Sequence, residues 1–142
     1  MTITIAAAQL AWDAAQSIVG AALRHAQDLG IRVSVAVVDA GGRPLAFGRM
    51  NGAPFHTVEI AQDKAFTAAS FGLPTAALAQ GLARQPDHVR HALTQRPRLV
   101  TLAGGLPIHA DGMLLGAVGV SGGSEEQDVA CAATGLACIA TI

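Results

Sequence analysis

The sequence is organised around the stretch Gly119-Val120-Ser121-Gly122-Gly123-Ser124-Glu125-Glu126-Gln127-Asp128. An apolar run over 113–120 ends at the Ser-Gly-Gly of this stretch, and a helical pattern follows directly. Ser124 and Gln127, three residues apart, have the form of a capping box, which predicts a helix N-terminus. The stretch therefore predicts a strand, a glycine bend and a helix in immediate succession.

A bend of this kind has two interpretations. The backbone N–H groups of a helix N-terminus converge, and together with the helix dipole they favour a carboxylate, a phosphate or a propionate. Alternatively, the bend is a tight connection that caps its own helix, because the Ser124 hydroxyl can accept from one of the donors. The local pattern favours the second interpretation, and both stay open at this point.

The composition is strongly apolar. Hydrophobic residues make up 51% of the 142 residues and charged residues only 13%, against about 25% charged residues in an ordinary soluble domain. So few charges do not cover a whole surface, which predicts that part of it is buried between the subunits of a homo-oligomer.

Charge and hydropathy also exclude two classes of partner. The formal net charge is −1, so no basic field attracts nucleic acid or an anionic membrane. No apolar run reaches the length of a transmembrane helix, and the first residues lack the basic segment of a signal peptide. We therefore expect a cytoplasmic protein with no nucleic-acid or membrane partner.

Periodicity and turn signals predict one α+β domain over residues 1–142. Two strands are predicted before the central helices and three after them. Hairpins join the strands within each of these two groups, which favours an antiparallel sheet. Trp12 is expected to pack beneath the first helix. The predicted helices cover 6–29, 57–71, 74–83, 87–93 and 124–140, and the predicted strands cover 31–38, 45–50, 99–103, 106–110 and 113–120.

Lys64 is the only lysine of the chain, against eight arginines. It is therefore not one of many solubilising charges. A single ammonium in so apolar a chain can bind the carboxylate of a ligand, or act as a base if burial lowers its pKa. The competing interpretation is a structural role, in which Lys64 pairs with Asp63 or with a backbone carbonyl.

His56 and Arg49 are two further candidates. His56 stands at the entrance to the helix that carries Lys64, where a histidine can serve as a ligand or a general base, or simply satisfy the helix end. Arg49 closes a strand and is either a bidentate carboxylate binder or a surface cation. No zinc spacing, phosphate loop or nucleophile elbow is present, so the metal content of the protein stays unknown.

Five motifs are spread over nearly the whole chain. They are Val35-Ala36-Val37-Val38-Asp39-Ala40-Gly41-Gly42, Arg49-Met50-Asn51-Gly52-Ala53-Pro54, Asp63-Lys64-Ala65 with Thr67-Ala68, Gly104-Gly105-Leu106-Pro107, and Gly116-Ala117-Val118-Gly119-Val120-Ser121-Gly122-Gly123 with Gln127-Asp128. In these motifs and their order the chain resembles the GlcG/HbpS-like family. The same domain forms the C-terminus of PduO-type corrinoid adenosyltransferases.

The resemblance implies a profilin-like α+β fold, with a roughly five-stranded antiparallel sheet flanked by helices, and it implies oligomers. It also implies haem as a candidate ligand, because some members bind haem and some degrade it or sense redox stress. The positions that match the family motifs and carry candidate ligand-binding residues are Lys64, Ser121, Gly122, Gly123 and Asp128.

Two functions follow as hypotheses. In the first, the protein binds haem or another tetrapyrrole: Lys64 and the amides of the Ser121-Gly122-Gly123 bend hold the propionates, and His56 approaches the iron. In the second, the protein is a catabolic lyase or isomerase of a small carboxylic or aromatic acid, and Lys64 or His56 transfers a proton. Whether the protein is an enzyme stays open, as does a domain with a vestigial pocket.

Overall fold

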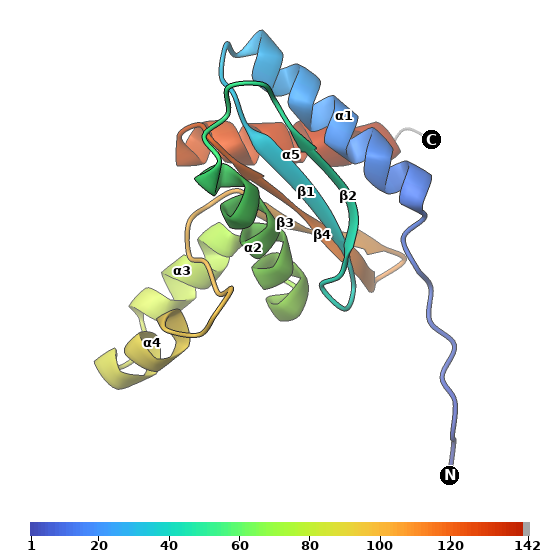
Figure 1. The fold of residues 1–142 in the computed structure, drawn as a ribbon. Helices are drawn as coiled ribbons and strands as arrows, with labels where there is room; N and C mark the ends of the chain where they lie inside the picture. Colours follow the sequence, from blue (N-terminus) through green and yellow to red (C-terminus); the bar gives the residue numbers. More distant parts are fainter. Residues whose placement is uncertain (141–142) are drawn as a thin grey trace.

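The computed structural model describes residues 1–140. Helices α1 and α5 cover one face of a sheet, α2 covers the other, and α3 and α4 lie beyond α2 (Figure 1). This is the predicted α+β class. The order is α1 (Trp12–Asp28), β1 (Ser34–Asp39), β2 (Pro44–Arg49), α2 (His56–Phe71), α3 (Thr75–Ala83), α4 (Asp87–Thr94), β3 (Gly105–Ala110), β4 (Met113–Ser121) and α5 (Glu125–Ala140).

Within the described residues the sheet has four strands in the order β2-β1-β4-β3, and every neighbouring pair is antiparallel. The expectation of about five strands was wrong because 99–103 is irregular. The Thr67 hydroxyl of α2 donates to the carbonyl of Arg98 at 2.8 Å and accepts from the N–H of Val100 at 3.0 Å. The backbone leading into this segment is therefore bonded to a helix and not to a neighbouring strand.

The predicted hairpins between β1 and β2 and between β3 and β4 are present, whereas the one expected between 99–103 and 106–110 is not, because 99–103 is irregular. In the β1–β2 turn the Asp39 carboxylate accepts hydrogen bonds from the N–H groups of Gly41 at 2.8 Å and Arg43 at 3.0 Å. In the β3–β4 turn Asp111 has φ 51° and Gly112 has φ 76°, the left-handed pair that a tight two-residue hairpin requires.

Alternation along β1 and β4 divides the core into two parts. Valines 35, 37, 118 and 120 face α1 and α5, whereas Ala36, Val38 and Ala117 face the alanines of α2. The small residues on the second face let α2 approach the sheet closely: a Cβ at Gly119 would lie 2.1 Å from the carbonyl oxygen of Ala61. This close approach brings the side chains of α2 within reach of the end of β4.

Helix α1 begins at Trp12 and not at residue 6. Residues 1–9 are exposed, and alanine-rich sequence alone does not sustain a helix without an apolar face to bury. The continuous buried face of α1 starts one turn later, at Ala15. The Trp12 ring is 63% exposed, so the expectation that it packs beneath the helix was wrong.

Candidate functional site

The bend between β4 and α5 requires glycine and caps its own helix. Gly122 has φ +139°, and a Cβ there would lie 2.3 Å from the carbonyl oxygen of Arg32. The Ser124 N–H donates to Gln127 Oε1 at 2.9 Å, and the Gln127 N–H donates to Ser124 Oγ at 3.1 Å. The predicted capping box is confirmed, and it uses two of the donors at the start of the helix.

Lys64 reaches from α2 to this bend. Its Nζ donates to the carbonyl oxygen of Val120 at 2.8 Å and to Asp128 Oδ2 at 2.9 Å. The other carboxylate oxygen, Asp128 Oδ1, accepts from the Gly123 N–H at 2.9 Å. The Lys64 and Asp128 side chains are only 2% and 4% exposed. The Asp128 carboxylate therefore binds the Lys64 ammonium and the Gly123 N–H, the two groups that were candidates for binding a ligand anion.

Gly104 borders the same corner, between the Lys64 side chain and the end of β4. It has φ +126°, and a Cβ there would lie 2.7 Å from the carbonyl oxygen of Val120 and 2.9 Å from Lys64 Nζ. Among residues 1–140, no buried side-chain nitrogen or oxygen lacks a hydrogen-bond partner. The corner formed by Lys64, Gly104, Val120, Gly123 and Asp128, called here the buried corner, is internally satisfied.

Burial raises the pKa of Asp128 above its usual value of 3.8, although the Lys64 ammonium and the amides of Gly123 and Gly122 act in the opposite direction. A carboxylate in such a place depends on its partners for its charge. Lys64 and the bend are thus coupled: a change in either alters the protonation of Asp128.

Arg49, Ser34 and Ser121 lie in one row across the sheet, because Ser34 pairs with Arg49 on β2 and with Ser121 on β4. The Ser34 hydroxyl is 2.9 Å from that of Thr57, which ties this row to the first turn of α2. Arg49 is exposed and its Nη1 donates to the carbonyl of Ala53 at 3.0 Å. This row and the first turn of α2 form one end of the sheet.

The structure therefore divides the predicted site residues into two groups. Lys64, Gly123 and Asp128 are in direct contact, and Ser121 and Gly122 adjoin them. Arg49 and His56 are exposed and lie at the sheet end, where Ser34, Thr57 and Ser121 are buried. His56 and Lys64 are eight residues apart on α2, or about 12 Å along its axis, and only Lys64 is buried, so the two candidate proton-transfer groups do not converge.

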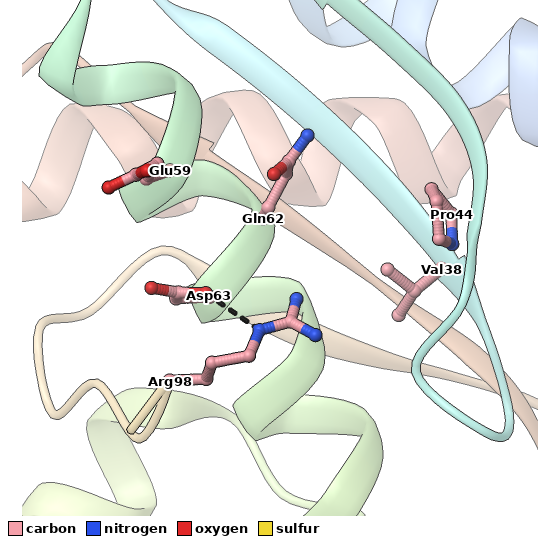
Figure 2. Close-up of a pocket in the computed structure, with 6 residues that line it drawn as sticks. All are labelled: Val38, Pro44, Glu59, Gln62, Asp63 and Arg98. Carbon is pink, nitrogen blue, oxygen red and sulfur yellow. Dashed lines mark hydrogen bonds and ion pairs between the residues drawn. The ribbon is translucent and has the colours of Figure 1, made fainter. Parts of the chain in front are cut away.

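A cleft of about 460 Å³ lies between the outer side of α2 and the β1–β2 hairpin, as Figure 2 shows. Asp63 and Arg98 form an ion pair at its edge, with 3.0 Å between Arg98 Nε and Asp63 Oδ1. The lining consists of Val38, Pro44, Glu59, Gln62, Asp63 and Arg98.

The sequence interpretation missed this cleft and its arginine. Asp63 and Arg98 are thirty-five positions apart, and no periodicity connects a helix residue to a residue in an irregular segment at that distance. The available signal was the placement of an arginine directly after Pro97, which stops the chain from continuing a helix.

Within residues 1–140 there is no group of three or more His, Cys, Asp or Glu side chains that could hold a metal ion. In the same range, every helix is too short or too polar to cross a membrane.

Comparison with known proteins agrees with the motifs. Residues 10–137 match the family model described as haem degrading protein HbpS-like. Protein GlcG of Escherichia coli K12 is 38% identical over 112 residues, which cover 79% of this chain and 81% of GlcG. Corrinoid adenosyltransferase PduO of Citrobacter freundii is 33% identical over 135 residues, which cover 94% of this chain and 40% of PduO. This chain thus spans less than half of that relative.

A solved structure shares both fold and sequence. The crystal structure of the PduOC:heme complex superimposes with a TM-score of 0.84 and 32% sequence identity, covering 92% of this chain and 94% of that chain. The predicted resemblance is therefore confirmed, and the chain belongs to the HbpS-like family.

Proposed function

We propose that this protein binds haem or a related tetrapyrrole at the sheet end, through its exposed residues Arg49, Phe55 and His56. The observation that supports the proposal most strongly is the likeness to the PduOC:heme complex, which extends over 92% of the chain. The family model, whose description names haem degradation, points to the same class of ligand.

The residues at the sheet end are of the kinds that haem requires. A haem iron takes an axial ligand such as histidine, and His56 is exposed in the first turn of α2. The neighbouring Phe55 is 87% exposed and offers an aromatic ring to the apolar macrocycle. Arg49 and Arg32 supply guanidinium groups for the two propionates; the Arg32 guanidinium lies against Gly52, in the loop before His56.

In this proposal the buried corner positions the site and does not touch the ligand. Lys64 and Asp128 fix the Gly122-Gly123 bend. The bend in turn positions Ser121 at the border of the sheet end where the haem is proposed to bind. The haem, when bound, supplies a redox-active iron, and the residues of the chain hold and orient it.

The proposal includes a cytoplasmic homo-oligomer. Only 13% of the residues are charged and Trp12 is 63% exposed, which supports burial of part of this weakly charged surface against another subunit. Light scattering after size exclusion, at several protein concentrations, measures the subunit number, and a monomer at all of them would contradict this part of the proposal.

Haemin titration of the purified protein tests ligand binding. We expect a Soret band that shifts and saturates at one haemin per chain. His56→Ala removes the axial ligand and should change the position of the band. Arg49→Ala should weaken binding about tenfold, the loss of one charge-assisted contact.

His109→Ala is the matched control, since His109 is also an exposed histidine but lies on β3 beside the β3–β4 turn. It should leave the titration unchanged. A wild-type protein that gives no saturable Soret change would overturn the haem assignment. A His56→Ala variant with the wild-type spectrum would overturn His56 as the axial ligand.

A further inference from the structure

We propose a second ligand site in the α2–hairpin cleft, where Arg98 binds the carboxylate of a short aliphatic monocarboxylic acid. The site shares no residue with the proposed haem surface. It rests on three features of the cleft: a fixed arginine, an unused hydrogen-bonding edge on that arginine, and an apolar wall facing it.

Arg98 is held in place from several directions. Its backbone has φ +70°, a conformation that costs a residue other than glycine about 1 kcal/mol or more and persists only where the surroundings impose it. Its carbonyl accepts the Thr67 hydroxyl at 2.8 Å, its Nε donates to Asp63 at 3.0 Å, and its guanidinium stacks 4.0 Å from the centre of the Phe66 ring. A long side chain fixed in this way loses little further entropy when it binds a ligand.

The terminal nitrogens of this arginine are not used by the protein. Across residues 1–140, the Arg98 side chain donates only through Nε. Figure 2 shows both terminal nitrogens directed away from Asp63, towards the side of the cleft formed by Val38 and Pro44. This free edge of a guanidinium presents two parallel N–H donors, the geometry that matches one carboxylate.

The other lining residues favour a particular hydrocarbon chain and a particular number of carboxylates in the bound acid. The exposed ring of Pro44 provides most of an apolar wall that suits a short hydrocarbon chain, because Val38 is only 1% exposed, and Gln62 offers an amide on the same side of α2. Glu59 lies at the rim with its carboxylate directed away from that wall. Glu59 and Asp63 together outweigh the charge of Arg98 by one negative charge, which opposes a dianion more strongly than a monoanion, so a monocarboxylate fits the cleft better than a dicarboxylate. The volume of about 460 Å³ accommodates an acid of a few carbons.

Calorimetric titration of the haem-free protein with acetate, propionate and butyrate at constant ionic strength tests the site. We expect saturable binding at about millimolar concentration. Affinity should rise with each added methylene by up to about fourfold, because each one removes apolar surface from water. Butylamine and succinate, matched to butyrate in length, should bind at least tenfold more weakly.

Arg98→Lys keeps the positive charge but loses the two-pronged edge, and it should weaken butyrate binding about tenfold. Arg96→Lys is the matched control, an exposed arginine two positions away that does not line this cleft; it should leave binding unchanged. Gln62→Glu provides a second test on the surface of α2, where added negative charge should also weaken binding. Absence of saturable binding, an affinity independent of chain length, or equal binding by wild type and Arg98→Lys would each overturn the proposal.

Discussion

Two consecutive residues of α2 form ion pairs on different sides of the helix. Lys64 faces the sheet and pairs with Asp128 at 2.9 Å, and both side chains are almost fully buried. Asp63 faces the cleft and pairs with Arg98 at 3.0 Å, with side-chain exposures of 27% and 44%. The two pairs have nearly the same length and belong to the same helix turn, so their difference lies in their surroundings.

Burial separates a structural pair from one that can bind a ligand. Two charges removed from water are tolerated only when hydrogen bonds complete their coordination, as Val120 and Gly123 do for Lys64 and Asp128. An exposed pair stabilises the fold by about 1 kcal/mol or less, but it leaves its outer edge open. Lys64 stood out as the only lysine of the sequence, but it is Arg98 that keeps free terminal donors beside a cleft.

The largest expected effect comes from breaking the buried pair. Lys64→Met should reduce the free energy of unfolding by about 3–5 kcal/mol, because it leaves the Asp128 carboxylate buried without its cation. Urea denaturation at pH 7, followed by circular dichroism, measures the loss.

The double variant Lys64→Met with Asp128→Leu is the informative control for this measurement. It removes both charges and should recover much of the stability, since an apolar pair of similar volume incurs no desolvation cost for charge. A Lys64→Met protein that loses less than about 1 kcal/mol, or a double variant no more stable than the single one, would show that the corner tolerates an unpaired carboxylate.

A smaller effect is expected at the exposed pair. Arg98→Ala should reduce the free energy of unfolding by roughly 1 kcal/mol, from the loss of a solvent-screened ion pair and a stacked ring. Arg98→Gly removes the same contacts, yet it should be more stable than Arg98→Ala by about 1 kcal/mol, because glycine adopts φ +70° without strain.

Thermal or urea unfolding of the two variants side by side gives this difference directly. Equal stability of the alanine and glycine variants would mean that the backbone at 98 is not strained. It would also weaken the view that the segment holds its arginine in a fixed position.

The elements of the fold were largely predictable, because they depend on local signals. The capping box at Ser124 and Gln127 and the turn at Asp111-Gly112 each act over a few residues. The segment 99–103 reads as a strand by composition, but a single hydroxyl from α2 bonds the backbone at both Arg98 and Val100. That contact spans more than thirty positions and leaves no periodic trace.

The candidate site was predictable only in part. The pattern singled out Lys64 and the bend, and it allowed a bond from Lys64 to a backbone carbonyl, but Asp63 was the wrong ionic partner. The ammonium pairs with Asp128 of the closing helix. Asp128 lies close to the bend in sequence, so its carboxylate folds back onto the Gly123 amide through one turn of helix. Which anion occupies a helix start depends on side-chain direction, which spacing alone does not give.

The pH dependence of stability extends the comparison to individual aspartates. Burial raises the pKa of Asp128, so the folded state holds its proton more tightly than the unfolded state does. Its contribution to stability is therefore fully present below about pH 3.8 and is lost as pH rises through the folded-state pKa. At Asp39, partial burial acts to raise the pKa, but the amides of Arg43 and Gly41 and the charge of Arg43 outweigh it and lower the pKa.

Asp39 should thus show the opposite dependence, with a contribution present above about pH 3.8 and lost as pH falls through its folded-state pKa. Unfolding of wild type, Asp128→Asn and Asp39→Asn between pH 3 and 6.5 separates the two, because asparagine keeps one acceptor oxygen and removes the titration. The stability of wild type relative to Asp128→Asn should fall with rising pH, and relative to Asp39→Asn it should rise. Slopes of the same sign would mean that Lys64 stabilises the Asp128 charge more than burial opposes it. In that case both the Lys64–Asp128 pair and the Asp63–Arg98 pair would favour the charged carboxylate, and they would differ only in their exposure to solvent.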